Sequence, residues 1–169
     1  HDKGRTFQTV KETLAELGYV VYSKVLNASD FGLPQNRERI FIVAVNKRFF
    51  PNQVFCFPEP PRTPTRVGDI LERNVPKKYW LSDKLWEGHQ RRLREHQAKG
   101  NGFGYSMFTR KSVRTSTISA RYYKDGSEIL IETSKNPRKI TPREAARLQG
   151  FPETFVIPVS DSQAYRQFG

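Results

Sequence analysis

Hydrophobic positions in the first part of the chain follow the period of a helix and then of two strands. Apolar residues spaced three and four apart predict a helix over residues 6–17, with Gly18 directly after its end. Residues 19–26 are rich in valine and tyrosine, and residues 39–45 are β-branched or aromatic, so both segments predict strands. A helix followed by two strands is typical of the terminal part of an α/β sheet.

Prolines interrupt this pattern in the next segment. Five of them fall within residues 51–65, which predicts a linker and a domain boundary. Beyond it the sequence predicts a short helical turn at residues 67–71. A longer helix is predicted over residues 82–99, because Ser82 is a good N-cap and Gly100 follows the last turn.

The last third of the chain predicts a hairpin and two further helices. Residues 117–121 and 129–133 are expected to form two strands, because an Asp-Gly pair between them favours a tight turn. Residues 141–144 read Thr-Pro-Arg-Glu, a capping box with proline at the first helical position. A final short helix is predicted over residues 160–168.

The charge balance narrows the class of partner. The 169 residues include 29 Lys+Arg and 17 Asp+Glu, a formal net charge of +12. Such a charge favours a polyanion through phosphate contacts and counterion release. A ribosomal or other RNA-binding protein would explain the charge equally well, and a soluble surface that happens to be basic is the bland alternative. No apolar stretch is long enough to span a bilayer, so no membrane partner is expected.

The chain has a single cysteine, Cys56. One cysteine excludes an intrachain disulfide and a multi-cysteine zinc site, which favours an intracellular protein and predicts no metal. Phe55 and Phe57 flank it, so we interpret it as a buried, unreactive thiol rather than a nucleophile.

A polar loop before the second predicted strand carries the strongest candidate site. In an extended segment alternate residues face the same way, so Gln35, Arg37 and Arg39 are expected to project together. Three donors on one face suit an anion or a carbonyl oxygen. The alternative is a solvated strand end in which Glu38 pairs with an arginine.

The segment Gln35-Asn36-Arg37-Glu38-Arg39 closely resembles the glutamine-x-arginine-x-arginine motif of DNA (cytosine-5) methyltransferases. Residues 141–152 resemble a second motif of this family, and residues 162–169 resemble the lead into its last motif. The resemblance implies an α/β fold: the terminal part of a Rossmann-like S-adenosylmethionine methyltransferase sheet plus a smaller, mixed α+β target recognition domain. It implies four parts: residues 1–50 of the catalytic domain, the 51–65 linker, the 66–136 target recognition domain, and residues 137–169, which dock the two domains.

The family resemblance also implies an activity. Its members flip a cytosine out of duplex DNA and transfer a methyl group from S-adenosylmethionine to C5. By resemblance, Arg39 reaches the flipped cytosine, Arg37 helps to hold the site and the phosphate backbone, and Gln35 orders groups around the pocket. The implied enzyme is of restriction–modification type and acts in the bacterial cytoplasm.

Within the middle region, Thr117-Ile118-Ser119-Ala120 resembles the short threonine signature of target recognition domains. That threonine approaches the DNA backbone in the family, and the cations around it can neutralise phosphates or read a guanine edge. The residues expected to bind DNA are Arg110, Lys111, Arg114, Thr117 and Arg121.

Several motifs of the family are not found in the sequence. It contains no Pro-Cys nucleophile, no Glu-Asn-Val motif and no glycine-rich cofactor loop. Both ends look like cuts through a larger protein, so the piece alone is expected to be inactive and its cofactor pocket to lie mostly elsewhere. The expected partners are double-stranded DNA and the missing N-terminal half or a partner subunit. A subunit of a split methyltransferase and a non-catalytic DNA-binding module remain alternatives.

Overall fold

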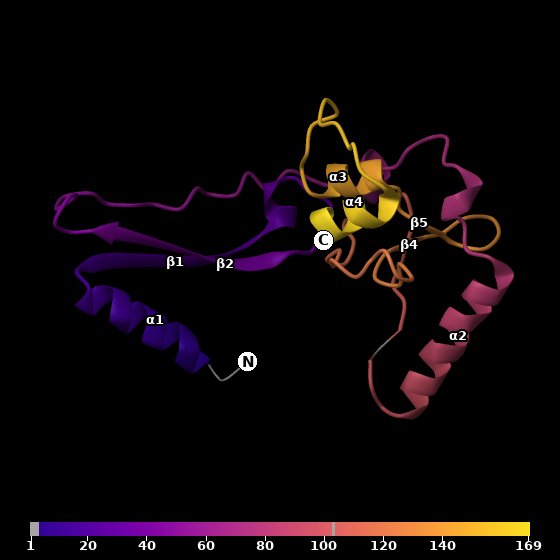
Figure 1. Ribbon diagram of the computed structural model, residues 1–169, viewed down its shortest axis with the longest axis horizontal. Helices are drawn as coiled ribbons and strands as arrows, with labels where there is room; N and C mark the ends of the chain where they lie inside the picture. Colours follow the sequence, from indigo (N-terminus) through magenta and orange to yellow (C-terminus); the bar gives the residue numbers. More distant parts are fainter. Residues whose placement is uncertain (1–3, 103) are drawn as a thin grey trace. The chain divides into compact units, whose positions relative to one another are not determined.

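A computed structural model describes residues 4–102 and 104–169, which form an α/β fold of two compact units (Figure 1). The first unit consists of His1–Asn27 and Glu38–Pro61. The second consists of Ala28–Arg37 and Arg62–Gly169. The chain therefore leaves the first unit after residue 27, returns to it after residue 37 and leaves it again after residue 61.

The first unit contains one helix and one strand pair, as the hydrophobic pattern predicts. Its elements are α1 (Arg5–Glu16), β1 (Tyr19–Asn27) and β2 (Glu38–Asn46). The two strands are antiparallel, and their register runs from the pair Tyr19–Asn46 to the pair Asn27–Glu38. Gly18 joins helix to strand with a φ of 85°, a left-handed conformation that glycine adopts without strain.

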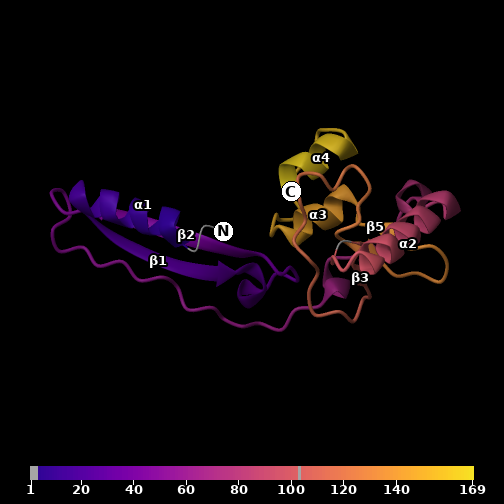
Figure 2. The same ribbon diagram turned by 90° about the horizontal axis from the view of Figure 1, so that it is seen from below.

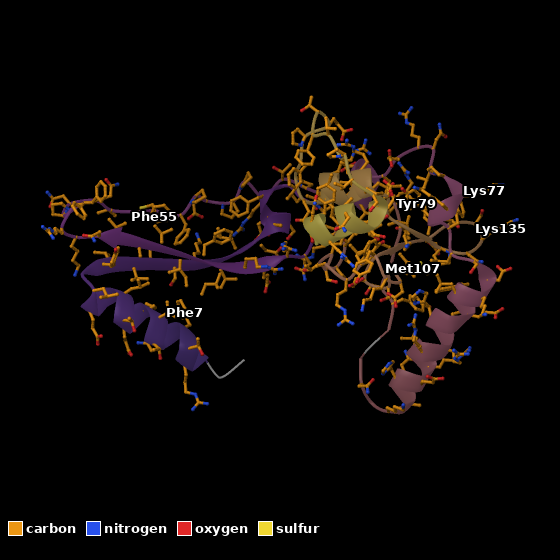
Figure 3. The ribbon with its side chains drawn as sticks, viewed as in Figure 1. Phe7, Phe55, Lys77, Tyr79, Met107 and Lys135 are labelled. Carbon is orange, nitrogen blue, oxygen red and sulfur yellow. The ribbon has the colours of Figure 1, made fainter. Side chains whose placement is uncertain are left out.

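The strand pair is covered on both faces but has no buried core. Helix α1 lies along one face, and the proline-containing segment of residues 51–61 runs along the other (Figures 1 and 2). On that second face the ring of Phe55, which Figure 3 labels, meets that of Tyr22 edge to face, 5.9 Å between centroids. None of the described residues of this unit is buried, and several large apolar side chains stay exposed, including Leu17, Val25, Phe49 and Val54.

Cys56 is exposed, so the expectation that it is buried is wrong. The segment around it is extended, and alternate side chains face the same way. Phe55 and Phe57 therefore point to one side, where their rings pack 4.9 Å apart, while the thiol between them points outward.

The second unit is built from short elements around one core. They are η2 (Ala28–Phe31), η3 (Val67–Asp69), η4 (Lys77–Tyr79), α2 (Asp83–Ala98), β3 (Met107–Phe108), β4 (Leu130–Ile131), β5 (Arg138–Lys139), α3 (Pro142–Leu148) and α4 (Asp161–Phe168). The predicted N-cap Ser82 accepts a hydrogen bond from the N–H of Leu85, and the predicted capping box at Thr141 is present. Figure 3 marks Tyr79 and Met107 in this unit.

The predicted hairpin is not formed. Strand β4 lies in the centre of a three-stranded sheet, parallel to β3 and antiparallel to β5. Residues 117–121 form no strand, because the backbone just before them bonds to residues 34–36 instead of to residues 129–133. The expected turn is nevertheless present, with Gly126 at a φ of 68°.

A buried tyrosine holds the core of the second unit together. The Tyr122 hydroxyl donates to the carbonyl of Ile129 at 2.6 Å and accepts from the N–H of Ile140 at 2.9 Å. Its ring meets that of Tyr165 on α4, 5.1 Å between centroids. Burial raises the pKa of Tyr122 far above its usual range. The phenol therefore stays neutral, and Tyr122 links the loop after β3 to Ile129, to Ile140 and, through its ring, to α4.

A buried ion pair fixes the start of α3. Arg138 donates two hydrogen bonds to the carboxylate of Glu144, at 2.7 and 2.8 Å, and both side chains are almost fully buried. Glu144 also accepts from the N–H groups of Thr141 and Glu72, each at 2.8 Å. Four donors therefore satisfy this carboxylate, which a buried charge requires.

Candidate nucleic-acid interface

The polar loop singled out in the sequence is hydrogen-bonded to the backbone of two distant residues, Ile118 and Leu148. Gln35 is fully buried; its amide nitrogen donates to the carbonyl of Leu148 at 3.0 Å, and its amide oxygen accepts from the N–H of Ile118 at 3.1 Å. Arg37 donates to the carbonyl of Ile118 at 3.4 Å. Gln35 and Arg37 together bind both the N–H and the carbonyl of Ile118. The amide group of Gln35 is buried against protein backbone and does not face solvent.

Backbone hydrogen bonds extend this junction. Thr115 and Asn36 are joined by an N–H to carbonyl bond of 2.9 Å, and the N–H of Thr115 donates to the carbonyl of Pro34 at 2.8 Å. The hydroxyl of Thr117 donates to the carbonyl of Asn36 at 2.6 Å. Residues 34–37 and 115–118 therefore form one structural piece of the second unit.

Arg39, the third member of the predicted set, belongs to the first unit. It lies on β2 opposite Leu26, its side chain is exposed, and its guanidinium donates to the carbonyl of Glu38 at 2.6 Å. The boundary between the two units therefore falls between Arg37 and Arg39.

The cations predicted to bind DNA lie in the second unit. Arg110, Lys111 and Arg114 follow β3 and are exposed; Arg110 donates to the carbonyl of Gly68 at 3.4 Å, and Arg114 donates to the hydroxyl of Ser29 at 3.2 Å. Arg121 is exposed on the turn after Thr117. The structure thus brings Arg114 and Thr117 onto the segment that the polar loop grips.

Two further exposed arginines, which sequence reasoning missed, line cavities together with these cations. Arg66 lines a cavity of about 500 Å³ together with Arg110 and Lys111. Arg62 lines a neighbouring cavity of about 340 Å³ together with Arg114. The prolines around these two arginines indicated a linker. The run Arg-Thr-Pro-Thr-Arg nevertheless indicated a candidate anion site, because two cations lie on either side of a conformationally rigid proline.

A smaller cavity of about 190 Å³ lies beside α2, with His89, Arg92 and Asp125 in its wall. His89 is buried, and burial, followed by the positive charge of Arg92, lowers its pKa. Arg92 in turn pairs with Asp125 at 3.3 Å. Across the described residues, no three or more His, Cys, Asp or Glu side chains come together as a metal site would need.

None of the described helices has the length and apolar content needed to cross a membrane.

Comparison with known proteins gives one consistent result. The family described as C-5 cytosine-specific DNA methylase matches residues 1–169. Type II methyltransferase M.SsoII of Shigella sonnei is 64% identical over 171 residues, which cover 100% of this chain and 45% of that protein. M.NlaX of Neisseria lactamica is 62% identical over 171 residues, with 53% of its length covered. M.HpaII of Haemophilus parainfluenzae is 40% identical, with 52% covered. The chain thus spans about half the length of the curated relatives it matches.

Solved structures share the fold. The S. pombe Dnmt2 methyltransferase superposes with a TM-score of 0.72 at 18% identity, over 99% of this chain and 57% of that one. The Entamoeba histolytica methyltransferase EhMeth gives 0.70 at 18% identity, over 96% of this chain and 52% of that one. Likeness at this identity concerns the α/β fold alone, whereas the family match covers the whole sequence. The chain belongs to the C-5 cytosine-specific DNA methylase family.

Proposed function

We propose that this chain is the second half of a DNA cytosine-5 methyltransferase of restriction–modification type that acts in the bacterial cytoplasm. The whole enzyme flips a target cytosine out of duplex DNA, because the reacting atoms are inaccessible inside the base stack. Family membership and the type II methyltransferase names of its relatives support this assignment. In the proposal, residues 66–136 recognise the DNA sequence and the arginines of the polar loop serve the flipped base.

One observation carries the proposal: the grip of Gln35 and Arg37 on the backbone of Ile118. It joins the loop that resembles a catalytic motif to the segment that resembles a recognition signature. A recognition segment that is bonded directly to the catalytic loop can place a bound duplex in register with the chemistry. In the proposal, a DNA backbone passes Thr117, which lies next to Ile118 in the chain.

Arg39 has the chemical role in this proposal. Nucleophilic attack on C6 of cytosine pushes electron density toward N3 and O2, and a fixed guanidinium beside O2 stabilises that charge as it develops. Arg37 lies two residues earlier and steadies the loop through Ile118. Gln35 acts further back, because its buried amide holds the loop against α3.

The cofactor and the nucleophile are assigned to the other half. S-adenosylmethionine supplies the methyl group in this family, but the described residues do not fit its binding loop. No glycine-rich turn leads from a described strand into a helix, which is how α/β folds hold such cofactors. The exposed apolar side chains of the first unit would pack against that half, whether it is part of the same protein or a partner subunit.

The test is Arg39→Ala in the full-length enzyme. Methyl transfer from labelled S-adenosylmethionine to duplex DNA is expected to fall about 100- to 1,000-fold in kcat, the usual effect of losing one charge-stabilising donor. The Kd for the same duplex, measured by fluorescence anisotropy, is expected to change only a few-fold. Arg48→Ala is the matched control, because Arg48 is another exposed arginine of the first unit.

If Arg39→Ala weakened DNA binding and methyl transfer equally, the proposed position of Arg39 beside the flipped base would be wrong. A full-length protein that binds duplex DNA but transfers no methyl group would favour the non-catalytic binding module instead.

A further inference from the structure

We propose that Arg62 and Arg66 form, with Arg110, Lys111 and Arg114, a groove that binds the sugar–phosphate backbone of duplex DNA. This inference rests on the proposed function and adds a second contact line to it, outside the recognition signature. The sequence motifs point to neither Arg62 nor Arg66. The groove consists of the two neighbouring cavities of about 500 and 340 Å³, which share Pro64, Thr65 and Val113 in their walls.

Hydrogen bonds hold the two walls of the groove together. The N–H of Val67 donates to the carbonyl of Ser112 at 2.8 Å, and the N–H of Gly68 donates to the carbonyl of Arg110 at 3.0 Å. The hydroxyl of Thr65 donates to the carbonyl of Val113 at 2.8 Å. These bonds fix residues 65–68 beside residues 110–113, so the folded chain already holds Arg66 close to Arg110 and Lys111.

Gly68 allows this close approach. A Cβ added at residue 68 would lie 2.7 Å from the carbonyl oxygen of Arg110, closer than real contacts allow. A side chain there would push the two walls apart. The absence of a side chain at residue 68 therefore keeps Arg66 and Arg110 within the same cavity.

Arg62 is held in an unusual backbone conformation. Its φ is 51°, and it is the one described residue other than glycine with a positive φ. Such a conformation is sparsely populated for residues with a Cβ and persists only where the surroundings enforce it. Here the N–H of Arg62 donates to the carbonyl of Asp30 at 3.0 Å, and the rigid Pro64 follows. The surroundings therefore hold this conformation at a residue that carries one of the five charges of the groove.

The chemistry of the groove favours a phosphate backbone over other ligands. The described residues of the two walls include five exposed cations and one carboxylate, that of Asp30. They are spread along two adjoining cavities, which suits a linear polyanion better than one small anion. Among the described residues, no aromatic side chain lines either cavity, so these walls do not offer the stacking platform on which single-stranded bases bind.

The experiment uses the full-length enzyme and a fluorescent duplex of random sequence. The double variant Arg62→Ala/Arg66→Ala is compared with the parent by anisotropy between 50 and 300 mM salt, a range of about sixfold chosen to resolve the salt slope. Loss of two phosphate contacts is expected to reduce the slope of log K against log[salt] by about 1.8. Saturating DNA is expected to restore the parental kcat, because neither residue is placed at the flipped base.

Matched variants separate charge from folding. Arg91→Ala/Arg94→Ala removes two exposed arginines from α2 and is expected to leave the slope unchanged. Arg62→Lys keeps the charge and is expected to keep the slope. Arg62→Gly removes the charge while relieving the positive φ, so it is expected to bind DNA as weakly as Arg62→Ala, even where thermal unfolding shows it to be the more stable of the two.

An unchanged slope in the Arg62/Arg66 double variant, together with a reduced slope in Arg110→Ala/Lys111→Ala, would overturn the inference and leave the proposed function intact. Equal slope losses in the groove variants and the α2 control would also overturn it, because the effect would then be one of net charge. Failure of the parent enzyme to bind duplex DNA would overturn both proposals.

Discussion

The amide oxygen of Gln35 accepts a 3.1 Å hydrogen bond from the N–H of Ile118, which lies 83 residues further along the chain. Both residues are fully buried, so no water can replace either partner. Through this bond the polar loop between β1 and β2 is fixed to the segment that leads into the core at Tyr122. This one contact therefore both stabilises the second unit and fixes the position of the loop.

Replacing Gln35 with leucine is expected to destabilise the full-length protein. The substitution keeps the volume but leaves the N–H of Ile118 and the carbonyl of Leu148 without a partner, at about 1–3 kcal/mol for each buried group. The urea midpoint of unfolding measures the loss. Gln8→Leu on the exposed face of α1 is the control and is expected to stay within about 0.5 kcal/mol. Equal midpoints for the two variants would mean that the Gln35 bonds are not maintained in solution.

Glu144→Gln is expected to cost about 3–5 kcal/mol, because it leaves the buried guanidinium of Arg138 without its counter-charge. Adding Arg138→Met to Glu144→Leu should cost little more than Glu144→Leu alone, since both variants have already lost the pair. Denaturant unfolding of the single and double variants gives the coupling energy. Glu132→Gln, an exposed change of the same type, serves as the reference. Additive losses would argue against a coupled pair.

The pH dependence of stability is expected to contain a contribution from His89. Burial and the positive charge of Arg92 lower its pKa in the folded state, whereas Asp125 opposes this shift. At pH values just below about 6.5, the pKa of histidine in the unfolded chain, His89 is therefore protonated in the unfolded chain but still neutral in the folded protein. The contribution of His89 is complete above that pH and is lost as the pH falls through the lower, folded pKa.

Unfolding free energies of the parent and His89→Gln, measured between about pH 7 and pH 5, check this expectation. The parent should lose stability more steeply than the variant. His96→Gln, on the same helix, controls for general effects of losing a histidine. Parallel curves for the parent and His89→Gln would show that His89 titrates normally.

Exchange of residues 66–136 between relatives is expected to move the DNA target, because the base-reading side chains are assigned to this segment. Protection of plasmid DNA against restriction enzymes of known specificity reports the methylated sequence. Exchange of residues 137–169 is the control and is expected to leave the target unchanged. A target that follows residues 137–169 would contradict the assignment.

Elements with local signals could be predicted from the sequence. Residues 6–17 and 82–99 have helical spacing and clear ends, and the structure places α1 and α2 there within one or two residues. The capping box at Thr141 likewise predicts α3, because cap and first turn are three residues apart. All the residues that make up such a signal lie within one short stretch of chain, so the element forms independently of how distant segments pair.

Pairing between distant segments could not be predicted. The Asp-Gly turn suggested a hairpin, but β4 instead pairs with β3 and β5, and residues 115–117 bond to residues 34–36. A glutamine is usually exposed, so the sequence suggested that Gln35 faces solvent. Its burial is explained by its hydrogen-bond partner Ile118, which lies 83 residues away in the sequence. Local preference is a weak guide where each backbone group can choose among several distant partners.

The junction between the polar loop and the recognition segment rests largely on main-chain groups. Gln35 binds an N–H and a carbonyl, and Asn36 and Thr115 meet through backbone atoms. Every amino acid other than proline offers the same two groups, so this form of attachment places little demand on side-chain identity. Under the proposed function, exposed positions such as Arg114 and Arg121 can therefore change to suit a different DNA target while residues 115–118 stay bonded to the loop. In that proposal, the DNA specificity can change while the main-chain bonds that attach residues 115–118 to the loop stay the same.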